Sequence, residues 1–213
     1  MKFISLGIIF FALSFCGLGE KLKQMGSGSS NSNSPSNGSS PSSNNAAPAP
    51  SAEKAIPTSA QQAIIDAGKE TKWDDQGLSW KLPTGWKKMD SSKISFTYQS
   101  PDSAFLLVNI SELGDDFPID VSLKAYYDRA MQQQKIGKYE AVKLVEIDGV
   151  SGVEFTEAAP AGKDDIRRHQ WIAYRKSNGQ VQQLNVMTST KASNFEKHDD
   201  DFSAILYSMK VAK

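Results

Sequence analysis

Residue types that commonly carry catalysis or bind metals are few in this sequence, and they do not cluster. The two histidines, His169 and His198, show no His-x-x-His spacing, and the only cysteine is Cys16. A zinc site needs several closely placed ligands, and a cysteine nucleophile needs a histidine partner in the same domain. The sequence contains neither a Gly-x-Ser-x-Gly elbow nor a phosphate-binding glycine loop. We therefore expect no enzymatic activity, no metal site and no cofactor.

Pairs and runs of aspartate are the second feature that could bind an ion. A calcium loop places its oxygen ligands at alternating positions, and none of these pairs has that spacing. We expect them to keep the surface soluble, and weak binding of a divalent cation is the alternative. The last run falls near the start of a predicted helix, where negative charge is favourable. The residues are Asp74-Asp75, Asp115-Asp116, Asp164-Asp165 and Asp199-Asp200-Asp201.

The N-terminus has the layout of a bacterial lipoprotein signal peptide. One positive charge, Lys2, precedes an apolar run over residues 3–15, and this run is too short for a membrane-spanning helix of about 20 residues. Leu13 to Cys16 resembles a lipobox, although Phe15 stands where a small residue is usual. We expect a signal peptide over residues 1–15 and acylation of Cys16, for example with palmitate. An uncleaved anchor and ordinary secretion are the alternatives.

A change in composition divides the rest of the chain. Residues 26–59 are almost all Ser, Asn, Gly, Pro and Ala, so they cannot bury enough apolar surface to fold. We predict a lipidated N-terminus over residues 16–25, a disordered tether over 26–68 and a folded domain over 69–213. The tether is expected to end in a short helix that is capped by Ser59 and ended by Gly68. The 24 basic and 24 acidic residues give zero net charge and form no basic stripe, which argues against a nucleic-acid partner.

The folded domain is predicted to be organised around one strand and the turn that follows it. Alternating apolar residues over 78–82 predict the strand, Pro83 ends it, and Gly85 permits a tight turn. Trp86 comes directly after this turn and is expected to fill the core. Trp73 lies in the polar segment before the strand and is expected to stay outside the core.

Hydrophobic periodicity predicts the remaining elements. An Asp-Gly and an Asn-Gly pair, each between two apolar runs, favour hairpin turns. Apolar residues at helical spacing predict two helices. Asp120 or Ser122 can cap the first, and Ser193 with Glu196 gives the second the spacing of a capping box. The expected fold class is α+β, with an antiparallel sheet of about six to seven strands sandwiched by helices. The expected strands are 78–82, 93–99, 105–110 (buried on both faces), 142–147, 150–156, 167–176 and 181–189, and the expected helices are 120–137 and 193–209.

The order of these elements, together with the sequence Leu82-Pro83-Thr84-Gly85-Trp86, resembles the PsbP-like fold over residues 77–211. That fold is shared by the photosystem II subunit PsbP, by bacterial DcrB-type lipoproteins and by a nuclear Ran-binding protein. The resemblance implies an α-β-α arrangement around an antiparallel sheet and a non-enzymatic binding role. It transfers no site residue, because members of the family bind unrelated partners.

The sequence therefore favours a binding or adaptor protein of the bacterial cell envelope, held to a membrane by its N-terminal lipid and bound to a protein partner. The alternative is a carrier of a small apolar ligand in a pocket between helix and sheet. Tyr126, Phe105 or Trp171 would line that pocket. Since Tyr126 and Tyr127 share the apolar stripe of their predicted helix, we expect them to pack on the sheet instead.

Overall fold

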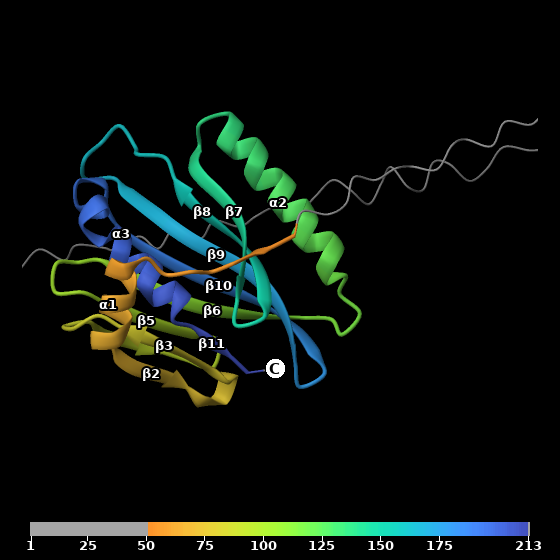
Figure 1. Ribbon diagram of the computed structural model, residues 1–213. Coiled ribbons are helices and arrows are strands. Elements are labelled where there is room, and N and C mark those ends of the chain that lie inside the picture. The colour runs from red at the N-terminus through yellow and green to blue at the C-terminus, as the bar shows by residue number, and fades with distance from the viewer. Residues whose placement is uncertain (1–50, 213) are drawn as a thin grey trace, which may run out of the picture. The chain divides into compact units, whose positions relative to one another are not determined.

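The computed structural model describes residues 51–212, which belong to one compact unit of the chain (Figure 1). The predicted signal peptide, the lipidation site at Cys16, residues 16–25 and the first part of the predicted tether lie outside the described residues. Residues 51–212 contain three α-helices and eleven strands, so the α+β class is confirmed. Among these described helices, none has the length and apolar character that crossing a membrane requires.

The larger of two sheets has eight strands, and its order follows the sequence closely. Neighbouring strands are antiparallel, except that the first is parallel to its neighbour. Most neighbours are also consecutive in the chain, because an antiparallel pair needs only a short connection. The spatial order is β1 (Glu53–Lys54), β7 (Tyr139–Ile147), β8 (Val150–Glu157), β9 (Ile166–Ser177), β10 (Gln180–Lys191), β6 (Phe105–Leu113), β5 (Ser95–Gln99) and β4 (Lys87–Ser91).

The two faces of the large sheet are covered differently (Figure 1). Helix α2 (Ile119–Lys135) packs on one face, over β7, β8 and β9. The smaller sheet and α3 (Ala192–Tyr207) pack on the other face, which we call the inner face, and α1 (Ser59–Ala67) packs on α3. The smaller sheet has the order β11 (Lys210–Val211), β3 (Leu78–Leu82) and β2 (Lys69–Trp73), with the short 3-10 helix η1 (Asp74–Gln76) between β2 and β3.

The main core lies between the two sheets. The predicted apolar face of β3 is buried, and the ring of Trp80 meets that of Phe96 edge-on with the centroids 5.9 Å apart. A second core lies under α2, where Tyr126 packs near Phe155 with their ring centroids 6.3 Å apart. Burial raises the pKa of Tyr126 to about 12, and the negative charge that Tyr139 would carry adds to this effect. Packing of the tyrosine stripe on the sheet is thus confirmed.

Both predicted hairpin turns are present. Asp148 and Gly149 between β7 and β8 have φ values of 49° and 82°, and Asn178 and Gly179 between β9 and β10 have values of 52° and 79°. Positive φ at both central residues defines the type I′ turn, which Asn-Gly and Asp-Gly pairs adopt at low cost. These turns fix the register of four strands that carry most of the site described below.

Strand β6 is buried on one face and not on both. Its inner residues Leu106, Val108 and Ile110 are at most 2% exposed, while the residues between them are partly exposed. The outer face of β6 stays open because α2 covers only β7, β8 and β9. The apolar run over residues 105–110 therefore belongs to a strand in the interior of the sheet that is covered on its inner face only.

The starts of the two long helices differ from the prediction. Helix α2 has Pro118 at its N-cap, and Asp120 lies inside its first turn. Helix α3 follows β10 without a loop, so that Lys191 is both the last strand residue and the N-cap. Ser193 is then already helical and cannot form the predicted capping box.

Trp73 and Trp86 exchange the places that the sequence predicted. Trp73 is 3% exposed within the main core, whereas Trp86 is only partly buried at its edge. The reason is β2, a strand that the sequence did not predict, whose antiparallel pairing sets Trp73 opposite Leu78. The turn itself is correct, since Trp86 donates a backbone hydrogen bond to Pro83 at 3.4 Å and Gly85 has a φ of 91°.

Residues 53–68 form part of the folded unit, so the predicted tether over 26–68 extends too far. Strand β1 pairs with β7, and α1 packs on α3. The predicted short helix is present, but its cap is Thr58: the Thr58 hydroxyl accepts from the Gln61 amide at 3.2 Å, and the Gln61 side chain accepts from the Thr58 amide at 3.0 Å. Composition did not predict this folding because the pairing of β1 with β7 and the packing of α1 on α3 are tertiary contacts.

Candidate functional site

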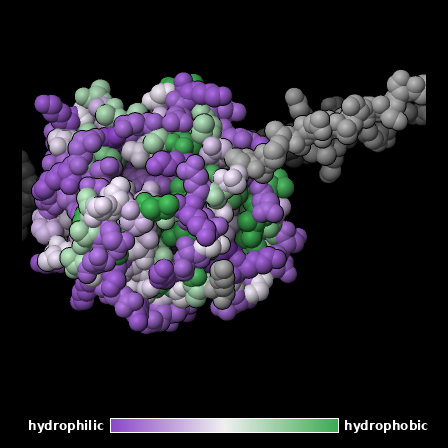
Figure 2. All heavy atoms as spheres, in the orientation of Figure 1, coloured by the Kyte–Doolittle hydropathy of each residue, from purple (hydrophilic) through white to green (hydrophobic). Residues whose placement is uncertain are grey.

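A cavity of about 300 Å³ lies where α3 and the start of α1 meet the inner face of β7, β8 and β9. We call it the polar cavity, and we call residues 55–58, which lead from β1 to α1, the strap. Figure 1 shows this segment crossing in front of the large sheet, and Figure 2 shows a mostly hydrophilic face with scattered hydrophobic patches. Ile56 and Thr58 of the strap line the cavity. Such a volume is typical of small-ligand sites.

Alternation along β8 and β9 explains why the floor of the cavity is polar. Successive side chains of a strand point to opposite faces, so Arg167, His169, Trp171 and Ala173 share the inner face of β9. One end of this row is apolar and belongs to the main core, and the other end is charged. Glu154 of β8 pairs with Trp171 across the ladder and adds a carboxylate at the border.

Glu154 and His169 form a buried pair on this floor. His169 Nε2 lies 2.7 Å from Glu154 Oε1, and the two residues are 4% and 6% exposed. The Tyr207 hydroxyl donates to both oxygens of the same carboxylate, at 3.0 and 3.1 Å. Burial alone would raise the pKa of Glu154, but hydrogen bonding and charge interaction with His169, together with the Tyr207 bond, lower it overall. Glu154 is therefore an ionised carboxylate held by two donors.

Tyr207 is held in the neutral form. Burial raises the pKa of its hydroxyl well above the usual range, and the negative charges of Glu154 and Asp199 add to the effect. A neutral hydroxyl keeps its proton for the bond to Glu154. Tyr207 therefore acts as a permanent donor that ties α3 to β8.

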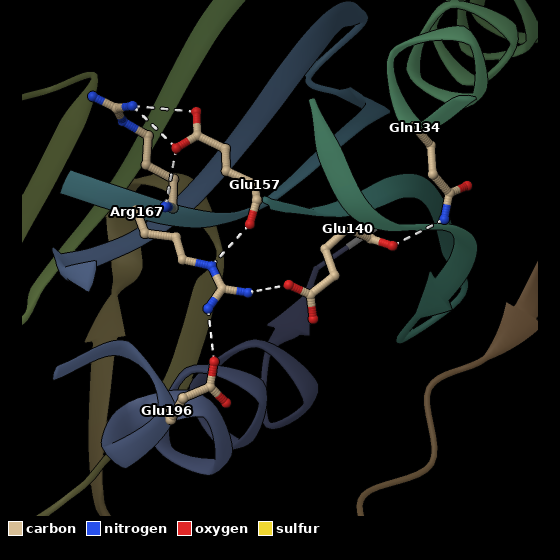
Figure 3. A network of polar contacts seen from close by, with 6 residues as sticks. Gln134, Glu140, Glu157, Arg167 and Glu196 are labelled. Carbon is tan, nitrogen blue, oxygen red and sulfur yellow. Dashed lines mark hydrogen bonds and ion pairs between the residues drawn. The ribbon is translucent and has the colours of Figure 1, made fainter. Parts of the chain in front are cut away.

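Arg167 holds one end of the polar cavity together (Figure 3). Its guanidinium donates through Nε to the Glu157 backbone oxygen at 2.9 Å, through Nη1 to Glu196 at 2.7 Å and through Nη2 to Glu140. The Arg167 side chain is 4% exposed, whereas those of Glu140 and Glu196 are 61% and 82% exposed. One buried cation thus joins β7, β8 and α3 to its own strand β9.

Two further contacts fix this network. The Arg167 guanidinium lies 4.1 Å from the centroid of the Phe195 ring, a cation–π contact that covers the planar group. The Gln134 side chain donates to the Glu140 backbone oxygen at 3.1 Å, which connects α2 to the same point. The donors of Arg167 face acceptors on three other elements, so the network is rigid as well as charged.

Three side chains that line the cavity stand apart from these networks. Asp199 and Lys143 are exposed, and within residues 51–212 neither forms an ion pair. Ser203 is 8% exposed, and no hydrogen bond of its hydroxyl to another described residue is seen. Partial burial and the negative charges of Glu196 and Asp200 raise the pKa of Asp199, against the opposing effect of nearby positive charges.

The arrangement is suited to holding a polar group. The buried charges already have partners, since Glu154 accepts from two donors and Arg167 donates to three acceptors. The free hydrogen-bonding capacity lies with Asp199 and Ser203 on α3 and with Lys143 on β7. Within residues 51–212, no three or more His, Cys, Asp and Glu side chains are placed to hold a metal ion. The cavity therefore offers charge and hydrogen bonds to a ligand.

The residues proposed for an apolar ligand pocket are not brought together. Trp171 is fully buried on the inner face, where a Cβ on Gly152 would lie 2.4 Å from its Nε1. Tyr126 belongs to α2 on the opposite face, and Phe105 is partly exposed on β6. These side chains are separated because strand alternation sends Trp171 away from α2. The cavity between helix and sheet is instead the polar one.

The histidines, Asp200 and Asp201 have structural roles. His198 is 4% exposed on α3, its Nδ1 lies 3.1 Å from Asp201, and its ring stacks on Phe202 with the centroids 5.7 Å apart, so it is a packed helix residue as expected. The run Asp199 to Asp201 lies in the middle of α3 and not near its start as expected, and its three side chains have different roles. Asp199 lines the polar cavity, Asp200 accepts from the Gln61 side chain at 3.1 Å, and Asp201 faces His198.

Sequence reasoning missed Glu154, Arg167 and Tyr207 as site residues. A usable signal was present, because Glu154 is a charged residue inside the apolar run of a predicted hairpin strand. An inward carboxylate needs a buried partner, and alternation on the next strand would have offered His169. Tyr207 gave no such signal, since it comes from a helix 53 residues later in the chain.

Comparison with known proteins gives similarity in structure only. No family model matches the sequence, and no curated protein matches it. LpqN of Mycobacterium tuberculosis, described as involved in cell envelope biogenesis, is 15% identical over 68% of this chain and 86% of its own, with a TM-score of 0.49. The solution structure of PsbP from Synechocystis sp. PCC 6803 is 14% identical over 68% and 94% of the two chains, with a TM-score of 0.43.

A protein from Bacteroides thetaiotaomicron VPI-5482 is 14% identical over 69% of this chain, with a TM-score of 0.45. The present chain spans about half of its length, 49%. PsbP, to which the sequence resemblance pointed, is among these similar structures. The similarity concerns the arrangement of strands and helices, and no site residue is taken over from it.

Proposed function

We propose that this chain is a lipid-anchored, non-catalytic binding protein of the bacterial cell envelope, and that its folded domain binds a protein partner at the polar cavity. The observation that carries the proposal is the cavity itself. Its walls are fixed by Glu154 and Arg167, which are buried and hydrogen-bonded to neighbouring elements, while Asp199 and Ser203 keep free hydrogen-bonding capacity. Rigid walls with free polar groups lower the ordering cost of binding.

Membrane attachment is the part of the proposal that rests on the sequence. Cys16 follows an apolar run with the layout of a lipoprotein signal peptide, and acyl chains on this residue would anchor the chain. Metabolic labelling with a palmitate analogue tests this in cells that express the full chain. We expect labelling of the wild type and of a Ser14→Ala control, and none of Cys16→Ala. An unlabelled wild type would refute the anchor without touching the binding proposal.

Partner binding is tested by photo-crosslinking in cells. A benzophenone amino acid replaces Ile56, which lines the polar cavity and is 79% exposed. The matched control replaces Val121, an equally apolar residue that is 69% exposed on α2, on the other face of the sheet. We expect one discrete protein adduct from position 56 and none from position 121. Equal adducts from both positions, or none from either, would contradict a protein partner at this face.

A further inference from the structure

We infer that the polar cavity receives a cationic group, an ammonium or a guanidinium, carried either by a small amine or by a basic side chain of the partner. This inference deepens the proposed function and rests on it for the location of the site. It follows from the balance of charge around the cavity, from two free acceptors on its wall, and from the poor fit of the other ligand classes.

The charge lining the cavity is negative in excess. Four carboxylates face two permanent cations, and Arg167 is shared by two of those carboxylates. Lys143 is exposed and forms no ion pair within the described part of the chain. His169 is bound to Glu154 and adds at most one positive charge. The four carboxylates are those of Glu140, Glu154, Glu196 and Asp199.

Asp199 is the carboxylate with the least compensation. It has no hydrogen bond or ion pair within residues 51–212, and Glu196 and Asp200 are its negative neighbours. Partial burial raises its pKa most and these neighbours add to the rise, while the charges of His169 and Arg167 oppose it without cancelling it, so the ionised form is less favourable than in water. A cationic group beside Asp199 removes this penalty, whereas an anion increases it.

Ser203 is the independent observation that points to a ligand. It lies one helical turn after Asp199 on α3, so the two side chains share one face of the helix. Ser203 is more than nine-tenths buried, lines the cavity, and its hydroxyl bonds to no other described residue. The hydroxyl is open to the cavity and is not sealed from solvent, and an ammonium or guanidinium there would donate to it. Asp199 and Ser203 together form a two-point acceptor.

Other ligand classes fit less well. An anion would meet four carboxylates against the one unpaired cation, Lys143, and a metal ion would find no set of three suitable side chains within residues 51–212. A purely apolar ligand would leave Asp199 and Ser203 without partners. A cation on an aliphatic stem fits both parts of the site, because Ile56 and Phe195 offer apolar surface beside the acceptors.

The test uses the full chain labelled with ¹⁵N, in detergent micelles, and titrates it with three probes of equal length. Butylamine carries the cation, butanol is its neutral counterpart, and butyrate is its anionic counterpart. We expect saturable shifts of amide signals around Asp199 and Ser203 with butylamine alone. Asp199→Asn should weaken butylamine binding by about tenfold or more, the loss of about one charge-assisted hydrogen bond.

Asp115→Asn is the matched control, because Asp115 is exposed in the loop before α2 and lies outside the cavity. It should leave binding unchanged. Ser203→Ala provides a second variant and should weaken binding less than Asp199→Asn. Equal response to butanol or butyrate, or unchanged affinity in Asp199→Asn, would overturn the inference.

A fourth probe, the peptide acetyl-Gly-Lys-Gly-amide, distinguishes a small amine from a basic side chain as the source of the cation. Tighter binding of this peptide than of butylamine identifies a basic side chain as the occupant, and weaker binding identifies a small amine; both outcomes support the inference. Failure of this inference can also be distinguished from failure of the proposed function. A discrete crosslink from position 56 without any butylamine binding would leave the partner site standing and refute the cationic occupant.

Discussion

The indole ring of Trp73 lies on the phenyl ring of Phe96, with the ring centroids 4.9 Å apart and the planes inclined by 37°. This contact joins the small sheet to the large one, because Trp73 ends β2 and Phe96 lies in β5. Trp80 of β3 approaches the same phenyl ring edge-on. The three rings form an aromatic centre in the core between the sheets.

Replacing Trp73 should therefore cost more stability than replacing Trp86. Trp73→Ala removes a side chain that is 3% exposed and leaves a cavity, which typically costs about 3–5 kcal/mol. Trp86 is only partly buried, so Trp86→Ala should cost about 1 kcal/mol. Urea unfolding of the full chain measures both. A larger loss for Trp86 would show that the aromatic centre is not the main core.

Gly152 is predicted to tolerate no side chain. A Cβ at this position would lie 2.5 Å from Trp171 Cε2 and 2.7 Å from the Ala173 Cβ, which is far inside contact distance. Gly152→Ala should lower the free energy of unfolding by about 1–3 kcal/mol through overpacking. Gly162→Ala is the control, since its new Cβ would meet only the movable carboxylate of Asp165. Equal unfolding midpoints for the two variants would refute this packing.

Arg167→Lys should be destabilising although charge is kept. A lysine cannot donate to Glu157, Glu140 and Glu196 with the fixed geometry of a guanidinium, and the lost charged hydrogen bonds are worth about 1.5–3 kcal/mol. The neighbouring Arg168→Lys is the matched control, because the Arg168 side chain is 41% exposed and surface pairs contribute about 1 kcal/mol or less. Thermal unfolding compares them directly, and the network assignment fails if Arg168→Lys is the more costly change.

Glu154→Gln should change how stability depends on acid. The folded pKa of Glu154 lies below its ordinary value of 4.5, so its ionised form stabilises the fold above about pH 4.5, and that contribution disappears as the pH falls through the folded pKa. The variant should be less stable than the wild type at pH 7, and the gap should close in acid. Urea titrations between pH 7 and pH 3 measure the gap. A gap that is constant with pH would mean that Glu154 is neutral in the folded state.

Asp199→Asn should change stability at neutral pH in the opposite direction to Glu154→Gln. The folded pKa of Asp199 lies above its ordinary value of 3.8, so the unfolded chain ionises first as the pH rises, and stability is lost on passing through the folded pKa. The variant should therefore be more stable than the wild type at pH 7 and equal to it below about pH 3.8. The same urea titrations serve, with Asp115→Asn as the control. A destabilised variant at neutral pH would show that Asp199 already has a favourable partner.

Local sequence patterns predicted those helices, strands and turns whose own residues show the expected periodicity or turn chemistry. Alternation identified β3 and the strands of both hairpins, Asp148-Gly149 and Asn178-Gly179 set the turns, and helical spacing located α2 and α3. Each of these depends on neighbours in the sequence, so periodicity and turn chemistry were sufficient. The α+β class followed directly from them.

Contacts between distant segments could not be predicted in this way. Strand β2 reads Lys-Glu-Thr-Lys-Trp and has almost no apolar alternation, so only its pairing with β3 reveals the burial of Trp73. The polar cavity depends on the same kind of contact. Glu154, His169 and Tyr207 meet because β8, β9 and α3 are packed together, and strand periodicity carries no information about the helix that covers them.

The strap gives the site a mechanical property. The chain that precedes Ser51 reaches the folded unit through β1, which is held to β7 over two residue pairs, and the next residues form a wall of the polar cavity. Tension on that chain would load these two pairs before it reached the long ladders of β8, β9 and β10. Ile56 and Thr58 would then move away while the core stayed folded. A pull on the preceding chain would thus open the cavity at a force too small to unfold the domain.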